Sequence, residues 1–266
     1  MKKRGDLSLL TTFIYLLSGL IGIAAFVYPF LLTGMQHAGG DPFFDRSIDA
    51  PILTLLLLII SLSVLFLETQ GQSISAKMIA ALGILVAATA TLRFIEVAIP
   101  GPGGFSPIFV PIILAGYVFG GRFGFLMGTL TMLVSALLTG GVGPWLPYQM
   151  FVAGWIGLTA GWLPHPHNSN AELLMLVVVG AGWGILYGLI MNIYFWPFIG
   201  GGLSYEPGSG VIESIGRYIL FYLTTSFVWD LARAVGNGLL LALLGQPIVR
   251  ALTRFRNKFN FQVLGT

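Results

Sequence analysis

Four charged residues lie inside long apolar stretches of this sequence, where charges are rare. Arg93 and Glu96 form one couple, and Asp230 and Arg233 form a second. The members of each couple are three residues apart, so their side chains share one face of a helix and can pair. A lone charge at the centre of a bilayer costs about 2.5–3.5 kcal/mol on insertion scales. Each couple, the second extended by Asn237 one turn further on, therefore belongs either to a transport pathway or to a structural brace.

A second group of residues combines aromatic rings with amide groups near the ends of apolar stretches. Residues 144–149 (PWLPYQ) form a rigid loop that leads into an apolar stretch, which suits the wall of a ligand site. Aromatic residues at a membrane interface are often simple anchors, but aromatic faces with a few amides can also hold a flat heterocycle. The sequence therefore predicts a substrate site. Its predicted residues are Trp145, Tyr148, Gln149, Trp155, Tyr187, Asn192, Trp196, Arg93 and Glu96.

The sequence gives little support for disulfide formation, metal binding, phosphate binding or catalysis. The chain has no cysteine, which excludes disulfides, thiolate metal sites and cysteine nucleophiles. It contains neither the phosphate-binding motif G-x-x-x-x-G-K-[ST] nor the zinc motif H-E-x-x-H. His165-Pro166-His167 is a weak metal signal and is better explained as a turn. We therefore expect no catalytic residue, no metal and no cofactor, and we do not expect an enzyme.

The composition indicates the environment of these residues. Of 266 residues, 56% are hydrophobic and only 9% are charged, whereas a soluble domain carries about 25% charged residues. The mean hydropathy is +0.89. These values exclude a soluble enzyme, a nucleic-acid-binding domain and a disordered protein. They indicate an all-α integral membrane protein whose main surroundings are the lipid bilayer.

The apolar stretches predict about eight transmembrane helices, since about 20 apolar residues span a bilayer. The alternating pattern of a membrane barrel is absent. The fourth, fifth and sixth stretches are short and glycine-rich, so we expect them to tilt or dip. The predicted spans are 8–33, 50–67, 74–98, 107–120, 122–139, 148–163, 171–199 and 215–246.

The cationic residues predict the orientation of these spans. Nine fall on one side of the predicted membrane, and only Arg46 and Arg217 fall on the other. By the positive-inside rule both termini are then cytoplasmic, as expected for a multi-pass protein of the plasma membrane. The outer loops are rich in glycine, proline and aromatic residues, which marks that face as the working face. The nine are Lys2, Lys3, Arg4, Lys77, Arg122, Arg250, Arg254, Arg256 and Lys258.

Small residues recur at helical spacing in several spans. Gly180, Gly184 and Gly188 line one stripe, and shorter glycine pairs occur at 157 and 161 and at 124 and 128. Such stripes let helices approach closely, so we expect ordinary packing between helices of the chain. The third span carries a longer stripe that can pack internally or dock another protein, and the residues alone favour internal packing. Its residues are Ala76, Ala80, Gly83, Ala87 and Ala90.

Three stretches in the same order resemble a known family. They are residues 105–135 (FSPIFVPIILAGYVFGGRFGFLMGTLTMLVS), residues 143–161, which contain GPWLPYQM and GWIGLTAG, and residues 230–237 (DLARAVGN), which precede a basic tail. Together they resemble the substrate-binding S components of energy-coupling factor (ECF) transporters, over about residues 75–258. The resemblance implies a six-helix core, here 73–266, that holds substrate near its outer face. The two additional N-terminal helices, in 1–72, depart from the minimal pattern.

The resemblance also implies partners. Members of this family bind a vitamin or a related micronutrient and work with a transmembrane T component and two ATPase subunits. Their first core helix carries an Ala-x-x-x-Ala motif that docks on the T component, and Ala76 and Ala80 match it. Gly83 and Ala87 continue the same face. Docking thereby becomes the favoured role of this stripe.

Two other functions stay open on the residues alone. The chain could be a self-sufficient ion-coupled transporter that uses Asp230 and Arg233 as its relay, or an intramembrane enzyme or assembly factor. The substrate cannot be identified from the residues. The long glycine-rich loops at 99–106 and 200–214 allow a wide mouth, which favours cobalamin, with a thiamin precursor as the second candidate.

Overall fold

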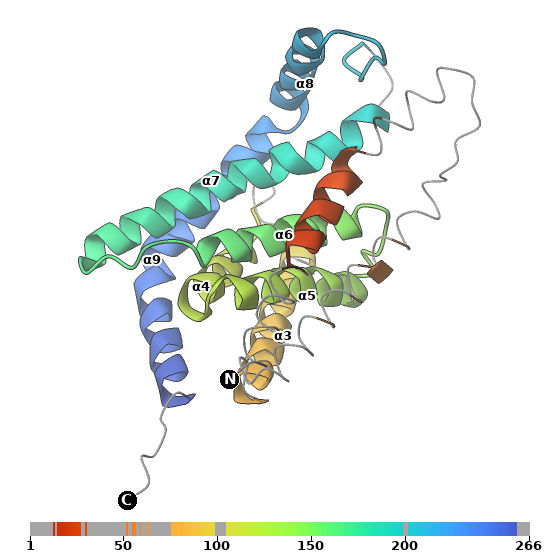
Figure 1. Cartoon of the computed structure of the whole chain (residues 1–266). Coiled ribbons are helices and arrows are strands. Elements are labelled where there is room, and N and C mark those ends of the chain that lie inside the picture. Colours follow the sequence, from red (N-terminus) through yellow and green to blue (C-terminus); the bar gives the residue numbers. More distant parts are fainter. Residues whose placement is uncertain are drawn as a thin grey trace, which may run out of the picture.

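The structure is a computed structural model of the chain (Figure 1). It describes residues 13, 15–27, 30, 52, 55, 56, 59, 63, 76–98, 105–198 and 202–259. The regular secondary structure of these residues is all helical, without a strand, as the composition predicts. An N-terminal helix covers Tyr15–Val27. The later elements are α3 (Ala76–Ala98), α4 (Phe109–Phe119), α5 (Gly121–Thr139), α6 (Leu146–Ala160), α7 (Ser169–Phe195), the 3₁₀ turn η2 (Trp196–Phe198), α8 (Val211–Thr225) and α9 (Phe227–Phe259).

Five of the predicted core spans each coincide with one helix, from α3 to α7. Among the described residues, four helices are long and apolar enough to cross a membrane: α3, α5, α7 and the stretch Phe227–Lys258 of α9. The total of eight crossings therefore stays a prediction. Most of the second predicted span, 50–67, and the proposed boundary at residue 72 lie outside the described residues.

The predicted last span, 215–246, is interrupted. Helix α8 ends at Thr225, and α9 begins at Phe227. The break coincides with three hydroxyl residues in a row at 224–226. The hydroxyl of Thr225 donates to the Phe221 carbonyl at 2.7 Å, and that of Thr224 donates to the Leu220 carbonyl at 2.8 Å. Such bonds compete with the backbone ladder and bend helices.

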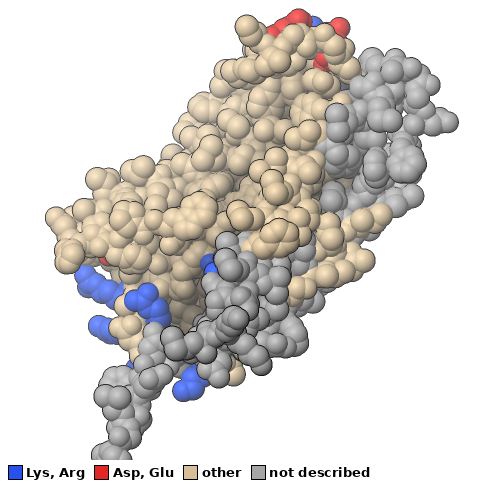
Figure 2. All heavy atoms as spheres, in the orientation of Figure 1, with Lys and Arg blue, Asp and Glu red and all other residues tan. Residues whose placement is uncertain are grey.

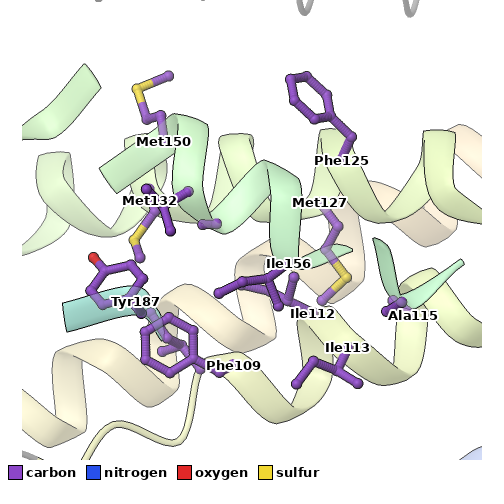
Figure 3. Packing of buried hydrophobic residues seen from close by; sticks show 14 of the residues in the cluster. Phe109, Ile112, Ile113, Ala115, Phe125, Met127, Met132, Met150, Ile156 and Tyr187 are labelled. Atoms are coloured by element: carbon purple, nitrogen blue, oxygen red, sulfur yellow. The ribbon is translucent and has the colours of Figure 1, made fainter. Parts of the chain in front are cut away.

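The middle of the molecule is a buried layer around α4. Nine residues of this eleven-residue helix are buried, and at about 1.5 Å per residue it is too short to cross a bilayer alone. Figure 3 shows Phe109, Ile112, Ile113 and Ala115 of α4 in the packing with side chains of α5, α6 and α7. The fourth predicted span is thus short, as the sequence indicates.

The glycine stripes are contacts between helices, as their spacing predicts. An added Cβ at Gly157 of α6 would lie 2.0 Å from the Gly124 carbonyl oxygen of α5, so the two backbones touch. Along α7, Gly180 faces Leu241, Gly184 faces Ala234, and Gly188 faces the Asp230 carboxylate, all on α9. In lipid, close backbone approach of this kind supplies the dispersion contacts that hold helices together.

Charge is distributed unevenly along the molecule. Figure 2 shows Lys and Arg atoms gathered at the lower end, where α9 ends, and acidic atoms at the opposite end. The acidic end carries Glu206 and Glu213, which both pair with Arg217. By the positive-inside rule, this pattern predicts that the basic end is cytoplasmic.

A labelling experiment tests that orientation. A cysteine at position 206 should react with an impermeant thiol reagent added outside intact cells, whereas one at position 167 should not. Both positions are exposed, and the native chain has no cysteine to add background. The opposite labelling pattern would overturn the orientation.

Candidate functional site

The two charge couples of the sequence meet in one cluster. Arg93 and Glu96 come from α3, whereas Asp230 and Arg233 come from α9. Glu96 interacts electrostatically with both arginines. Tyr187 of α7 interacts with Arg93, Glu96 and Arg233 and is itself buried. The cluster thus joins three helices that are far apart in the sequence.

The α9 couple pairs as its spacing predicts. The Arg233 guanidinium donates to the Asp230 carboxylate and, at 3.4 Å, to the Gly184 carbonyl of α7. Its Cζ atom lies 5.3 Å from the ring centroid of Tyr187 and 6.0 Å from that of Phe109. Figure 3 shows Tyr187 over Phe109, and their ring centroids are 4.7 Å apart.

The surroundings of this pair are closely packed. Asp230 is 2% exposed and occupies the space left by Gly188. Two turns further along α9, the Asn237 amide donates to the Gly180 carbonyl at 3.2 Å. Asp230, Arg233 and Asn237 therefore all connect α9 to α7.

The α3 couple does not pair directly, although its spacing is the same. No described carboxylate lies within salt-bridge distance of Arg93. Its guanidinium donates instead to the Met132 sulfur of α5 at 2.9 Å and to the Gln149 Oε1 of α6 at 3.4 Å. Glu96 accepts a hydrogen bond of 2.6 Å from the Ser106 hydroxyl. Each side chain thus turns to a different neighbour, and the two attract each other only over a longer distance.

The predicted aromatic residues of α6 lie in different surroundings. Trp145 precedes α6, is 44% exposed, and donates its indole N–H to the Gly141 carbonyl at 3.2 Å. Tyr148 is buried and stacks on Tyr194 with ring centroids 3.8 Å apart. Both Tyr148 and Trp155 contact Phe26 of the N-terminal helix, at 5.0 and 6.1 Å between centroids.

The last two predicted residues lie near the end of α7. The Asn192 amide donates to the Gly188 carbonyl at 2.8 Å, and its oxygen accepts from the Ser226 hydroxyl at 3.1 Å. Trp196 is buried and donates to the Leu203 carbonyl at 2.7 Å. Its ring also contacts Tyr205 of the following loop and Tyr218 of α8.

The structure thus brings only part of the predicted site together. One cluster contains four of the predicted residues, namely Arg93, Glu96, Gln149 and Tyr187. The ion pair of Asp230 and Arg233 on α9 belongs to the same cluster. Two further members, Ser106 and Met132, were missed by the sequence analysis. Neither Ser106 nor Met132 belongs to a sequence motif that marks a binding residue. Only the tertiary structure therefore shows that they contact the cluster. The remaining predicted residues, Trp145, Tyr148, Trp155, Asn192 and Trp196, form separate packing contacts.

The small-residue stripe of α3 is largely open. Ala76, Ala80, Gly83 and Ala87 are exposed, and a Cβ added at Gly83 would meet nothing within 4 Å. Ala90 differs, because it is fully buried in the chain's own core. Beside the stripe, a groove of 300 Å³ runs between α3 and α5, lined only by apolar residues.

Metal binding finds no support in the described part of the chain, which contains no cluster of three or more His, Cys, Asp or Glu side chains suited to a metal ion. His165 packs as a structural residue. Its ring stacks on Tyr117 at 4.4 Å with an interplanar angle of 16°, and its Nε2 lies 3.3 Å from the Tyr117 carbonyl oxygen.

Comparison with known proteins identifies the family. The family model described as "ECF transporter, substrate-specific component" matches residues 77–245, from the start of α3 to the middle of α9. No curated protein and no solved structure matches the chain. The match covers well over half of the sequence and includes every member of the charged cluster. The chain therefore belongs to the substrate-specific components of ECF transporters, which are substrate-binding transporter subunits of the membrane and not enzymes.

Proposed function

We propose that this chain captures a vitamin or a related micronutrient at the outer face of the plasma membrane and passes it inward together with a T component and two ATPase subunits. The family match over residues 77–245 is the observation that carries this proposal. The sequence has no phosphate-binding motif of its own, which agrees with ATP hydrolysis on separate subunits. Both termini of the chain are then cytoplasmic.

The open stripe of α3 supplies the docking face for the T component. Small side chains let a partner helix approach the backbone closely, which is the main source of helix association in lipid. Ala76, Ala80, Gly83 and Ala87 are exposed, and an apolar groove lies beside them. This placement favours docking over internal packing for these four residues.

The charged cluster supplies the recognition of the substrate. Arg93, Glu96, Gln149 and Tyr187 combine charge, an amide and an aromatic ring in a half-buried setting near the end of α3. Exposed Trp145 precedes Gln149 by one helical turn, and we place it at the rim of this site as part of the proposal. We assign Tyr148, Trp155, Asn192 and Trp196 to packing between neighbouring elements, because their rings and amides contact those elements.

Uptake assays test the proposal. Cells that express this chain with a T component and two ATPases should take up labelled cobalamin, or failing that a labelled thiamin precursor. Replacing the phosphate-binding lysine of the ATPases should abolish the uptake. Uptake that persists without working ATPases would instead support the self-sufficient ion-coupled transporter.

Substitution of Gln149 tests the location of the substrate site. Gln149→Ala removes an acceptor of Arg93, and a hydrogen bond to a charged group contributes about 1.5–3 kcal/mol. We expect the affinity for the transported compound to fall about ten- to hundredfold, measured by titration calorimetry on the purified chain. Gln246→Ala is the matched control, because Gln246 donates to the Ser169 carbonyl at the other end of α7. Normal binding by Gln149→Ala would remove this residue from the site.

A further inference from the structure

The acceptors that the described residues offer Arg93 are uncharged. A guanidinium carries five N–H donors and forms its strongest bonds with carboxylates and phosphates. In this chain Arg93 donates to a thioether sulfur, which is a weak acceptor, and to one amide oxygen at 3.4 Å, and it also interacts with the neutral Tyr187 hydroxyl. The described residues thus offer Arg93 no anionic acceptor within hydrogen-bonding distance.

The other three charges of the cluster already have good partners. Arg233 is bound to Asp230 and lies against the rings of Tyr187 and Phe109. Glu96 accepts a short hydrogen bond from Ser106. Arg93 is therefore the member of the cluster that a ligand can approach with the largest gain in hydrogen bonding.

The neighbours of Arg93 suit a ligand. Arg93 and Gln149 are half-buried, so both side chains are partly accessible from the surface. A ligand group could therefore reach them and lose its water without crossing the buried core. The Gln149 oxygen faces Arg93, and no described residue accepts from its NH₂ group. We propose that the substrate presents a single negative charge, on a carboxylate or a phosphodiester, to the Arg93 guanidinium. This inference rests on the proposed function.

The balance of charge disfavours a ligand with more than one negative charge. The cluster holds two arginines and two carboxylates, which cancel. A monoanion leaves one negative charge in a half-buried site, whereas a phosphate monoester leaves close to two, and uncompensated buried charge is costly. Of the two candidate substrates, cobalamin carries such a group in its phosphodiester, and an unphosphorylated thiamin precursor does not.

Matched pairs of small probes test this inference on the purified full-length chain. Benzoate is compared with benzamide, and dimethyl phosphate with trimethyl phosphate, so that each pair differs mainly in charge. At about tenfold excess over its dissociation constant, a bound anion should raise the unfolding temperature by about 2–4 °C. We expect at least one anion to stabilise the chain and both neutral probes to have no effect. The pair that responds distinguishes carboxylate from phosphodiester recognition.

Variants assign the effect to Arg93. The stabilisation should disappear in Arg93→Gln and persist in Arg217→Gln, which removes an arginine already paired with Glu206 and Glu213. Should Arg93→Gln fail to fold, Arg93→Lys keeps the charge without the planar fork, and we expect it to retain a weaker effect. Equal effects of charged and neutral probes, no effect of either anion, or full stabilisation of Arg93→Gln would each overturn the inference.

These outcomes are independent of the transporter partners. Selectivity for an anion without assembly with a T component would leave the Arg93 site intact and defeat the proposed function. Assembly and ATP-dependent uptake without selectivity for an anion would leave the proposed function intact and defeat only this inference.

Discussion

Replacing Ala80 or Gly83 by tryptophan should abolish uptake while the purified chain still binds its substrate. Both positions are exposed on the stripe of α3, and Gly83 has open space where a side chain would begin. A tryptophan there would separate α3 from a partner helix and remove the contacts that close approach provides. Overpacking costs about 1–3 kcal/mol or more, which corresponds to about a tenfold to hundredfold loss of affinity for the T component.

Ala88→Trp is the matched control for this experiment. Ala88 lies on α3 and is also exposed, but it falls on a different side of the helix from the stripe. Each variant is purified, its substrate affinity is measured, and its co-purification with the T component is compared. Loss of substrate affinity together with misfolding would favour internal packing of the stripe. Normal assembly by Gly83→Trp would exclude this face as the docking surface.

Arg233→Met should destabilise the chain by about 3–5 kcal/mol, because it leaves Asp230 buried without its cation. Asp230 is 2% exposed and fits against the backbone of Gly188, so water cannot reach it without movement of α7 or α9. A loss of this size is a large part of the total stability of a typical protein. Chemical unfolding in detergent micelles measures it.

Two further variants separate the effect of the buried charge from other effects. Adding Asp230→Asn to Arg233→Met removes the uncompensated charge and should recover much of the stability. Arg217→Met breaks the ion pairs of Arg217 with two exposed carboxylates, and exposed pairs contribute only about 0–1 kcal/mol. Equal losses from Arg217→Met and Arg233→Met would contradict the structural role of the buried pair.

The helical class and most helix positions could be predicted from the sequence because lipid constrains them strongly. Apolar length and low charge indicate the helices, and the glycine spacing at 180, 184 and 188 indicates a close helix contact. The partner in that contact could not be predicted, since spacing does not say that the Asp230 carboxylate fills the space beside Gly188. The break at Ser226 was also missed, because apolar residues resume at Phe227 directly after the three hydroxyl residues.

The ion pairing in the charged cluster could not be predicted from residue spacing along a helix. Residues 93 and 96 have the same spacing as residues 230 and 233, yet only the second couple forms an ion pair. Arg93 donates hydrogen bonds to Met132 and Gln149, and Glu96 accepts one from Ser106. None of these three partners belongs to α3. Spacing within one helix can predict that two side chains share a face. It cannot predict which neighbour in space competes for them.

The contacts of the aromatic residues could not be predicted from the sequence either. The sequence places Tyr148, Trp155 and Trp196 near the ends of apolar stretches, which suits either a ligand wall or an anchor. In the structure their rings contact Phe26, Tyr194 and Tyr205. Phe26 and Tyr205 belong to segments whose positions relative to the core cannot be deduced from a pattern of hydrophobicity.

Co-purification from membranes tests whether this chain assembles with a T component and two ATPase subunits. The tagged full-length chain is co-expressed with a T component and two ATPase subunits, solubilised in mild detergent and isolated through its tag. We expect a stable complex that contains all four chains, and the same complex should fail to form with Gly83→Trp. Recovery of the well-folded wild-type chain alone, from membranes that contain all the partners, would show that the chain does not assemble as proposed.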